Sequence, residues 1–122
     1  MMNNKIYQRI YDELSKYLKK DDSLIVYMEY GEESYSFAFY VKNGKKIVKC
    51  YDLPGVKEST IMESFKVIDA IVAPERNAMK TKWSNMTITI SNDGDMHADI
   101  DYTDLSQGSY KYKKEWKEKY LK

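Results

Sequence analysis

The sequence predicts an α+β protein in which an antiparallel sheet, made of a three-stranded meander plus a hairpin, has helices packed on it. Apolar residues recur with helical spacing near the beginning, in the middle and at the end of the chain. Between these stretches they alternate with polar residues, as in half-buried strands, and Asn-Gly and Asp-Gly turn signals separate the alternating segments. The predicted order is α-β-β-β-α-β-β-α, in a single domain over residues 1–122.

The first helix is predicted over residues 6–18, where apolar side chains fall on one face and charged side chains on the other. Asp21-Asp22 interrupts this pattern. Three strands are predicted next, over residues 24–30, 35–41 and 46–51. Asn43-Gly44 predicts a type I′ hairpin between the second and the third strand, because both residues tolerate a positive φ.

The middle helix is predicted to begin near Thr60, where Thr60-x-x-Glu63 has the pattern of a capping box. Pro74 either ends this helix or begins a short second one over residues 75–80. A hairpin follows, with strands 86–90 and 96–102 joined at Asp93-Gly94. The chain closes with a helix over residues 110–122.

The last strand divides its side chains between two faces. One face is predicted to carry Met96, Ala98, Ile100 and Tyr102, and the other His97, Asp99 and Asp101. The closing helix repeats Trp116, Tyr120 and Leu121 at the spacing of a packed face. We therefore expect these apolar residues to form one packed strand–helix unit, with the carboxylates facing outward.

Composition limits the classes of function. The chain has 122 residues, 43% of them hydrophobic and 32% charged, which is typical of a folded protein. No apolar run approaches the roughly 20 residues needed to cross a bilayer, and the polar start is unlike a signal peptide. We expect a cytoplasmic protein without a membrane partner. The single cysteine, Cys50, excludes an internal disulfide.

Charge is distributed unevenly although the net charge is only +1. Five aspartates and no lysine or arginine lie between Asp93 and Asp104, whereas six lysines and two glutamates lie between Lys111 and Lys122. A solvated face beside a solvated helix explains this distribution without any function. Tyrosine occurs 12 times, which suits protein interfaces and also half-buried strands.

The residues for catalysis are few, and we expect neither an enzyme nor a cofactor. His97, Asp99 and Asp101 are the only candidate ligands for a metal site. Three side chains along one strand span about 13 Å, however, and a metal ion normally draws its ligands from more than one element. Alternation on an exposed face explains them more simply, so no metal is expected. Cys50 is interpreted as a small core residue.

Nucleic-acid binding is the alternative function. The closing helix interleaves lysines with aromatic residues, so a small nucleic-acid-binding module would use Lys113 and Lys117. The neighbouring aspartates and the near-zero net charge argue against this use, and direct nucleic-acid binding is not expected.

A resemblance enters in the last third of the chain. Trp83 precedes an Asn-Met-Thr-Ile-Thr-Ile strand, and the Asp-Gly turn leads into residues 98–102, with 103–106 after them and Trp116-x-x-x-Tyr120-Leu121 at the end. This pattern resembles the YezG-like family of antitoxin and immunity proteins, which belong to bacterial polymorphic and contact-dependent toxin systems. The resemblance implies a structural role for the residues that match the family motif, which are Trp83, Gly94, Tyr102, Leu105, Trp116, Tyr120 and Leu121. The chain departs from the family's closing motif in lacking an aromatic residue at position 118.

The resemblance implies a protein that binds a cognate toxin domain, often a nuclease, and blocks its active site without any turnover. An inhibitor that presents carboxylates to a basic nuclease cleft gains association rate by electrostatic steering. The candidate toxin-binding carboxylates are Asp99, Asp101, Asp104, Glu29, Glu32 and Glu33. The alternative is structural: Asp104 caps a turn and Tyr102 packs on Trp116.

Overall fold

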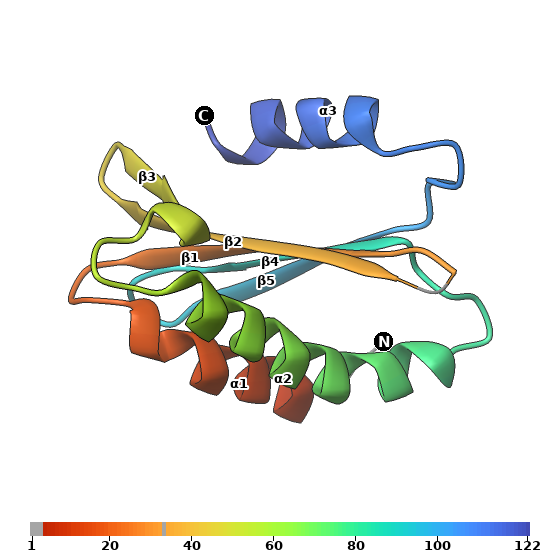
Figure 1. Ribbon diagram of the computed structural model, residues 1–122, viewed down its shortest axis with the longest axis horizontal. Coiled ribbons are helices and arrows are strands. Elements are labelled where there is room, and N and C mark those ends of the chain that lie inside the picture. The colour runs from red at the N-terminus through yellow and green to blue at the C-terminus, as the bar shows by residue number, and fades with distance from the viewer. Residues whose placement is uncertain (1–3, 33) are drawn as a thin grey trace.

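The computed structural model describes residues 4–32 and 34–122, which form a five-stranded antiparallel sheet between two layers of helices. Helices α1 and α2 lie side by side on one face of the sheet, and α3 lies alone on the other (Figure 1). The elements are α1 (Asn4–Leu14), β1 (Ser23–Tyr30), β2 (Tyr35–Asn43), β3 (Lys46–Lys49), α2 (Glu58–Asn77), β4 (Asn85–Ile90), β5 (Met96–Asp101) and α3 (Tyr110–Tyr120). The predicted α+β class and element order are confirmed.

The meander and the hairpin join into one sheet with strand order β3-β2-β1-β4-β5. The central strand β1 pairs antiparallel with β2 on one side and with β4 on the other. The hairpin therefore extends the sheet through β4, and β5 lies at the edge opposite to β3.

The larger core lies between the sheet and the α1–α2 layer. Every second residue of β1 points into it, and Ile10 and Leu14 of α1 meet the strand there, fully buried. Burying one side chain of this size contributes about 1.5–3 kcal/mol. The alternation of β1, β2 and β4 predicts this face correctly, because one strand face has room only for apolar side chains.

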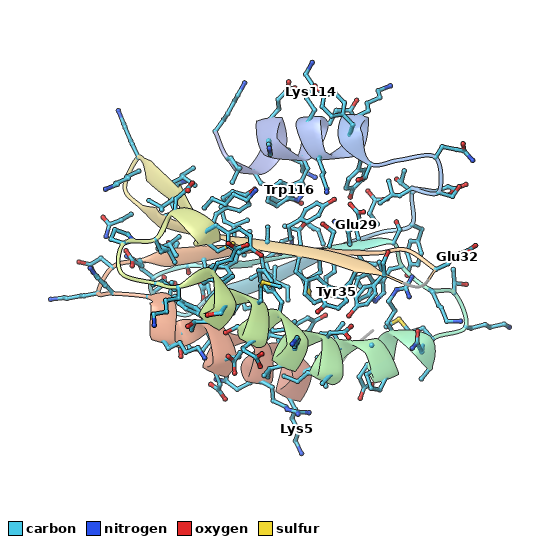
Figure 2. All side chains as sticks on the ribbon, viewed as in Figure 1. Lys5, Glu29, Glu32, Tyr35, Lys114 and Trp116 are labelled. Atoms are coloured by element: carbon cyan, nitrogen blue, oxygen red, sulfur yellow. The ribbon has the colours of Figure 1, made fainter. Side chains whose placement is uncertain are left out.

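A smaller core lies under α3, on the opposite face of the sheet. It contains Ile25, Tyr27, Tyr40 and Trp116, all buried. Trp116 points from α3 toward the strands, whereas Lys114 points away from them (Figure 2). One aromatic anchor thus fixes a helix whose other face is lysine-rich.

The middle helix departs from its prediction at both ends. It begins at Glu58, and Lys57 is its N-cap without a side-chain hydrogen bond, so the predicted Thr60–Glu63 capping box is wrong. The helix also continues through Pro74 to Asn77 as one element. A proline in a last turn removes a single hydrogen bond, to the carbonyl of residue 70, and Ala70 is exposed so that water can hydrate it.

Turn chemistry corrects the first hairpin. Asn43 pairs with Lys46, so Gly44 and Lys45 form the two-residue loop. Gly44 has a φ of +59°, and Asn43 has no positive φ, so the predicted type I′ turn centred on Asn43-Gly44 is wrong. Glycine at the first central position is the pattern of a type II′ turn. Strand β3 also ends earlier than predicted, since a 3-10 turn begins at Cys50.

Candidate functional site

The face of the sheet under α3 carries two rows of side chains across three strands. In the first row, Tyr27 of β1 pairs with Thr87 of β4, which pairs with Asp99 of β5. In the second row, Glu29 pairs with Asn85, which pairs with Asp101. Paired residues have their side chains on the same face, so the predicted acidic residues of β1 and β5 lie on one surface. Figure 2 shows Glu29 in the layer between the sheet and α3.

A chain of buried hydrogen bonds connects α3 to this surface. The Trp116 indole Nε1–H donates to the Thr87 hydroxyl at 2.8 Å, and that hydroxyl donates to the Asn85 side-chain oxygen at 3.2 Å. Asn85 is only 1% exposed, and its amide nitrogen has no partner. Buried polar groups of this kind cost free energy unless they are paired, so the bonds select one position for α3.

Asp99 contacts the end of α3. Its carboxylate accepts a hydrogen bond from the Tyr120 hydroxyl at 2.6 Å and a second contact from the His97 ring at 2.9 Å. The Tyr120 hydrogen bond, more than the opposing burial, holds the pKa of Asp99 below its ordinary value. Burial, helped by Asp99, raises the pKa of Tyr120 to about 12. Asp99 is therefore an ionised acceptor for α3.

Asp101 contacts the beginning of α3 and the loop before it. One carboxylate oxygen accepts from the Thr103 backbone N–H at 2.8 Å and from its hydroxyl at 2.6 Å, and the other accepts from the Tyr112 hydroxyl at 3.0 Å. The Thr103 bonds lower the pKa of Asp101 more than burial raises it. Asp101 thereby fixes the direction in which the chain leaves β5.

The expectation of a solvated outward face is therefore wrong for Asp99 and Asp101. They do face away from the larger core, as alternation predicts, but α3 covers that side and leaves both half-buried. In the sketched metal triad, the Asp101 carboxylate turns to Thr103 and Tyr112, away from His97. Within residues 4–32 and 34–122, no group of three or more His, Cys, Asp or Glu side chains is arranged to hold a metal ion.

The predicted packed strand–helix unit is also wrong. Ala98 and Ile100 pack into the larger core below the sheet, whereas Trp116 packs above it against Tyr27, Tyr40 and Tyr120. Strand and helix lie on opposite sides because the apolar face of β5 completes the α1–α2 core. Met96 is exposed, and Tyr102 does not reach Trp116: it is 56% exposed.

The exposed tyrosine belongs to a groove at the end of the sheet, which we call the acidic groove. It has a volume of about 710 Å³ and is lined on its acidic side by Glu29, Glu32 and Asp104 with Tyr102 beside them. Glu29 and Glu32 meet Asp104 there because the backbone N–H of Tyr30 donates to the Ser84 carbonyl and that of Ser84 to the Asp101 carbonyl. Glu33, the remaining candidate, lies outside the described residues.

Basic side chains complete the groove. Arg76 and Lys82 also belong to its lining. The Arg76 guanidinium donates from Nε to the Trp83 carbonyl at 2.6 Å and lies 4.8 Å from the centre of the Tyr30 ring. Its charge is thus turned toward aromatic side chains. The sequence carries no signal for Arg76, and Asn85 appears there only as the first residue of the Asn-Met-Thr-Ile-Thr-Ile strand, with nothing to mark its buried hydrogen bond.

Asp104 holds its own turn at the rim of the groove. Its carboxylate accepts the Ser106 backbone N–H at 2.9 Å, which lowers the pKa of this exposed acid. The predicted turn cap is therefore observed, and it leaves the carboxylate accessible. Trp83 is fully buried, Leu105 is half-buried and lines the groove, and Gly94 turns the hairpin with a φ of +92°.

The closing helix turns most of its aromatic side chains toward the sheet. Tyr112, Trp116 and Tyr120 pack in the smaller core, and Tyr110 is 83% exposed. Base stacking along α3 would need rings on its outer face. Tyr112, Trp116 and Tyr120 thus hold α3 on the sheet and are not available for base stacking.

No helix in the part of the chain that the structure describes is both long and apolar enough to span a bilayer. No protein-family model matches the chain, and no curated protein matches it in sequence.

Proposed function

We propose that this chain is a cytoplasmic immunity protein that binds a cognate bacterial toxin domain, a nuclease, and neutralises it by blocking its active site. The observation that carries the proposal is the acidic groove. Carboxylates from β1, from the turn after it and from the loop after β5 converge there beside the exposed Tyr102. The resemblance of the last third of the chain to immunity proteins gives the class of partner.

The chemistry of the groove suits a basic partner surface. A nuclease cleft is positively charged because it binds phosphates, and opposed charges raise the association rate and fix the orientation of the two proteins. Tyr102 adds an aromatic anchor with a polar tip, the type of side chain that contributes most at protein interfaces. Glu32 projects from the end of the sheet (Figure 2), where a partner can reach it.

Asp99 and Asp101 have a supporting part in this proposal. Asp101 holds Thr103 by two hydrogen bonds, and Thr103 stands between Tyr102 and Asp104 in the loop that lines the groove. A loop fixed before binding loses less conformational entropy on association. The direct contacts are therefore assigned to Glu29, Glu32, Tyr102 and Asp104.

Co-expression with the toxin domain encoded beside its gene tests the proposal. Cells that produce both proteins should survive, and the purified protein should inhibit the nuclease at a one-to-one ratio. The double charge reversal Glu32→Lys with Asp104→Lys should slow association at low salt at least about tenfold. If the unaltered protein neither protects cells nor inhibits the nuclease in excess, the proposal is wrong.

A matched control separates the groove from general charge. Glu118→Lys, compared with the single groove variant Asp104→Lys, places one charge reversal on an exposed position of α3, away from the groove lining. It should leave inhibition unchanged. Equal loss in Glu118→Lys and in the groove variant would show that the groove is not the contact surface.

A further inference from the structure

A second cavity lies between α3 and the β2–β3 edge of the sheet. It has a volume of about 300 Å³, at the lower limit of small-molecule sites. Lysines from two elements line it together with aromatic side chains: Lys49 at the end of β3, Lys113 and Lys117 of α3, and Tyr40, Tyr51 and Trp116. The acidic groove shares none of these residues.

The positive charge of this cavity is not neutralised. In residues 4–32 and 34–122, none of the three lysines is in an ion pair, and no Asp or Glu belongs to the cavity lining. Lys113 is half-buried, and its Nζ has a single long hydrogen bond of 3.4 Å, to the Ser36 hydroxyl. Three cations from two directions around one cavity create a local site for an anion.

Aromatic rings supply the rest of the wall. Trp116 and Tyr40 are buried with ring centres 5.6 Å apart and form the floor. Tyr51, which is 43% exposed, lines the margin of the cavity, and its ring packs edge-on against Phe65 of the larger core. A flat ring can stack on such a surface and gain contact area with little loss of entropy. An inorganic anion alone would leave this wall unused.

We propose that this cavity binds a planar ring carrying a phosphate, with a nucleoside monophosphate as the ligand. The phosphate is held by Lys49, Lys113 and Lys117, and the base lies against Tyr51 over the Trp116–Tyr40 floor. This inference does not rest on the proposed function, because the cavity and the acidic groove share no lining residue.

Calorimetric titration of the full chain at low salt tests the proposal with three probes. Adenosine monophosphate should bind more tightly than inorganic phosphate, which lacks the ring, and than adenosine, which lacks the phosphate. Binding that is equal for the monophosphate and for inorganic phosphate would overturn the ring contact. Absence of binding by the monophosphate at millimolar concentration would overturn the site.

Substitutions within α3 provide the matched comparison. Lys113→Ala should weaken monophosphate binding about tenfold, as expected for loss of one charge-assisted hydrogen bond. Lys114→Ala removes the same charge from the next residue, which points away from the sheet (Figure 2), and should leave binding unchanged. Equal weakening by both variants would reduce the effect to general charge and overturn the proposal.

Two further measurements identify the ligand. Tyr51→Leu should abolish the preference for the monophosphate over inorganic phosphate and leave phosphate binding intact; a retained preference would overturn the stacking role. A ten-nucleotide single strand should bind no more tightly than the monophosphate. If the strand binds much more tightly and Lys114→Ala weakens it too, the ligand is a nucleic-acid strand along α3 and the small-ligand proposal is wrong.

Discussion

The Trp116 indole Nε1–H donates to the Thr87 hydroxyl at 2.8 Å, and both side chains are buried. This bond connects α3 to β4, the strand that joins the hairpin to the meander. Two more hydrogen bonds, Tyr112–Asp101 and Tyr120–Asp99, connect the same helix to the edge strand β5. The position of α3, and hence the cavity between α3 and the β2–β3 edge, therefore depends on a few side-chain hydrogen bonds to the sheet.

Removing the Trp116–Thr87 bond should destabilise the protein measurably. Thr87→Val keeps the shape of the side chain and leaves the indole N–H buried without a partner, which costs about 1–3 kcal/mol. Urea unfolding measures this difference. Thr89→Val is the control, because Thr89 lies two residues along on the same face of β4 and is less buried. If both variants lose equal stability, the bond contributes nothing specific.

The sequence predicts the layers of this fold well because alternation along a strand is set by geometry. Each of β1, β2 and β4 has one face that fits only an apolar layer. The Asp93-Gly94 turn is recognisable because Gly94 takes a positive φ, which glycine tolerates. The C-terminal strand was harder. Its two faces are predicted correctly, but α3 packs on the face of the carboxylates, not on the face of Ala98 and Ile100, and it covers the carboxylates that are expected to face solvent.

The acidic groove shows a second limit. Glu29 and Asp104 stand far apart in the sequence, and only the β1–β4–β5 register brings them to one end of the sheet. The acidic residues can be listed as candidates from the sequence alone. Nothing in the sequence places Arg76 of α2 in the same groove. Non-local strand pairing carries this information, and no local pattern records it.

Acid should weaken the attachment of α3. Hydrogen bonds from Tyr120 and from Thr103 hold the pKa values of Asp99 and Asp101 below the ordinary 3.8. A carboxylate with a lowered folded-state pKa contributes stability that is fully present above its unfolded-state pKa and is lost as the pH falls through the folded-state value. The free energy of unfolding should therefore decrease below about pH 4.

Tyr120→Phe isolates the part due to Asp99. The variant lacks the main cause of the lowered pKa of Asp99, so its unfolding free energy should depend less steeply on pH in the acid range than that of the unaltered protein. Tyr110→Phe changes an exposed hydroxyl on the same helix and should not alter the slope. Parallel pH curves for the unaltered protein and Tyr120→Phe would refute this assignment.

Ser64 connects the two helices of the other layer. Its buried hydroxyl donates to the Glu13 carboxylate at 2.8 Å and lies 2.6 Å from the Tyr17 hydroxyl. Ser64→Ala should lower the free energy of unfolding by about 0.5–1.5 kcal/mol, since it removes the contacts to Glu13 and Tyr17, which keep Lys16 and the Thr60 carbonyl as partners. Chemical denaturation measures the loss. Ser59→Ala, at an exposed position of α2, should stay within about 0.5 kcal/mol of the unaltered protein.

Pro74→Ala should stabilise the protein without changing its fold. The proline stands within α2, where it has no N–H to donate to the carbonyl of residue 70. Alanine restores that bond and avoids a helix-interior penalty of about 3 kcal/mol. The ring also restricts the unfolded chain, an advantage of about 0.4–1 kcal/mol that the substitution gives up. The difference gives an expected net gain of about 2 kcal/mol, measured by urea unfolding.

The second proline of the chain is the natural control for this gain. Pro54 lies in the exposed turn before α2, outside any helix, so Pro54→Ala gives up the same restriction of the unfolded chain and restores no helical bond. It should destabilise the protein slightly, by up to about 1 kcal/mol. If Pro74→Ala behaves like Pro54→Ala, α2 already accommodates the ring at no cost, and the unpaired carbonyl of Ala70 is fully satisfied by solvent.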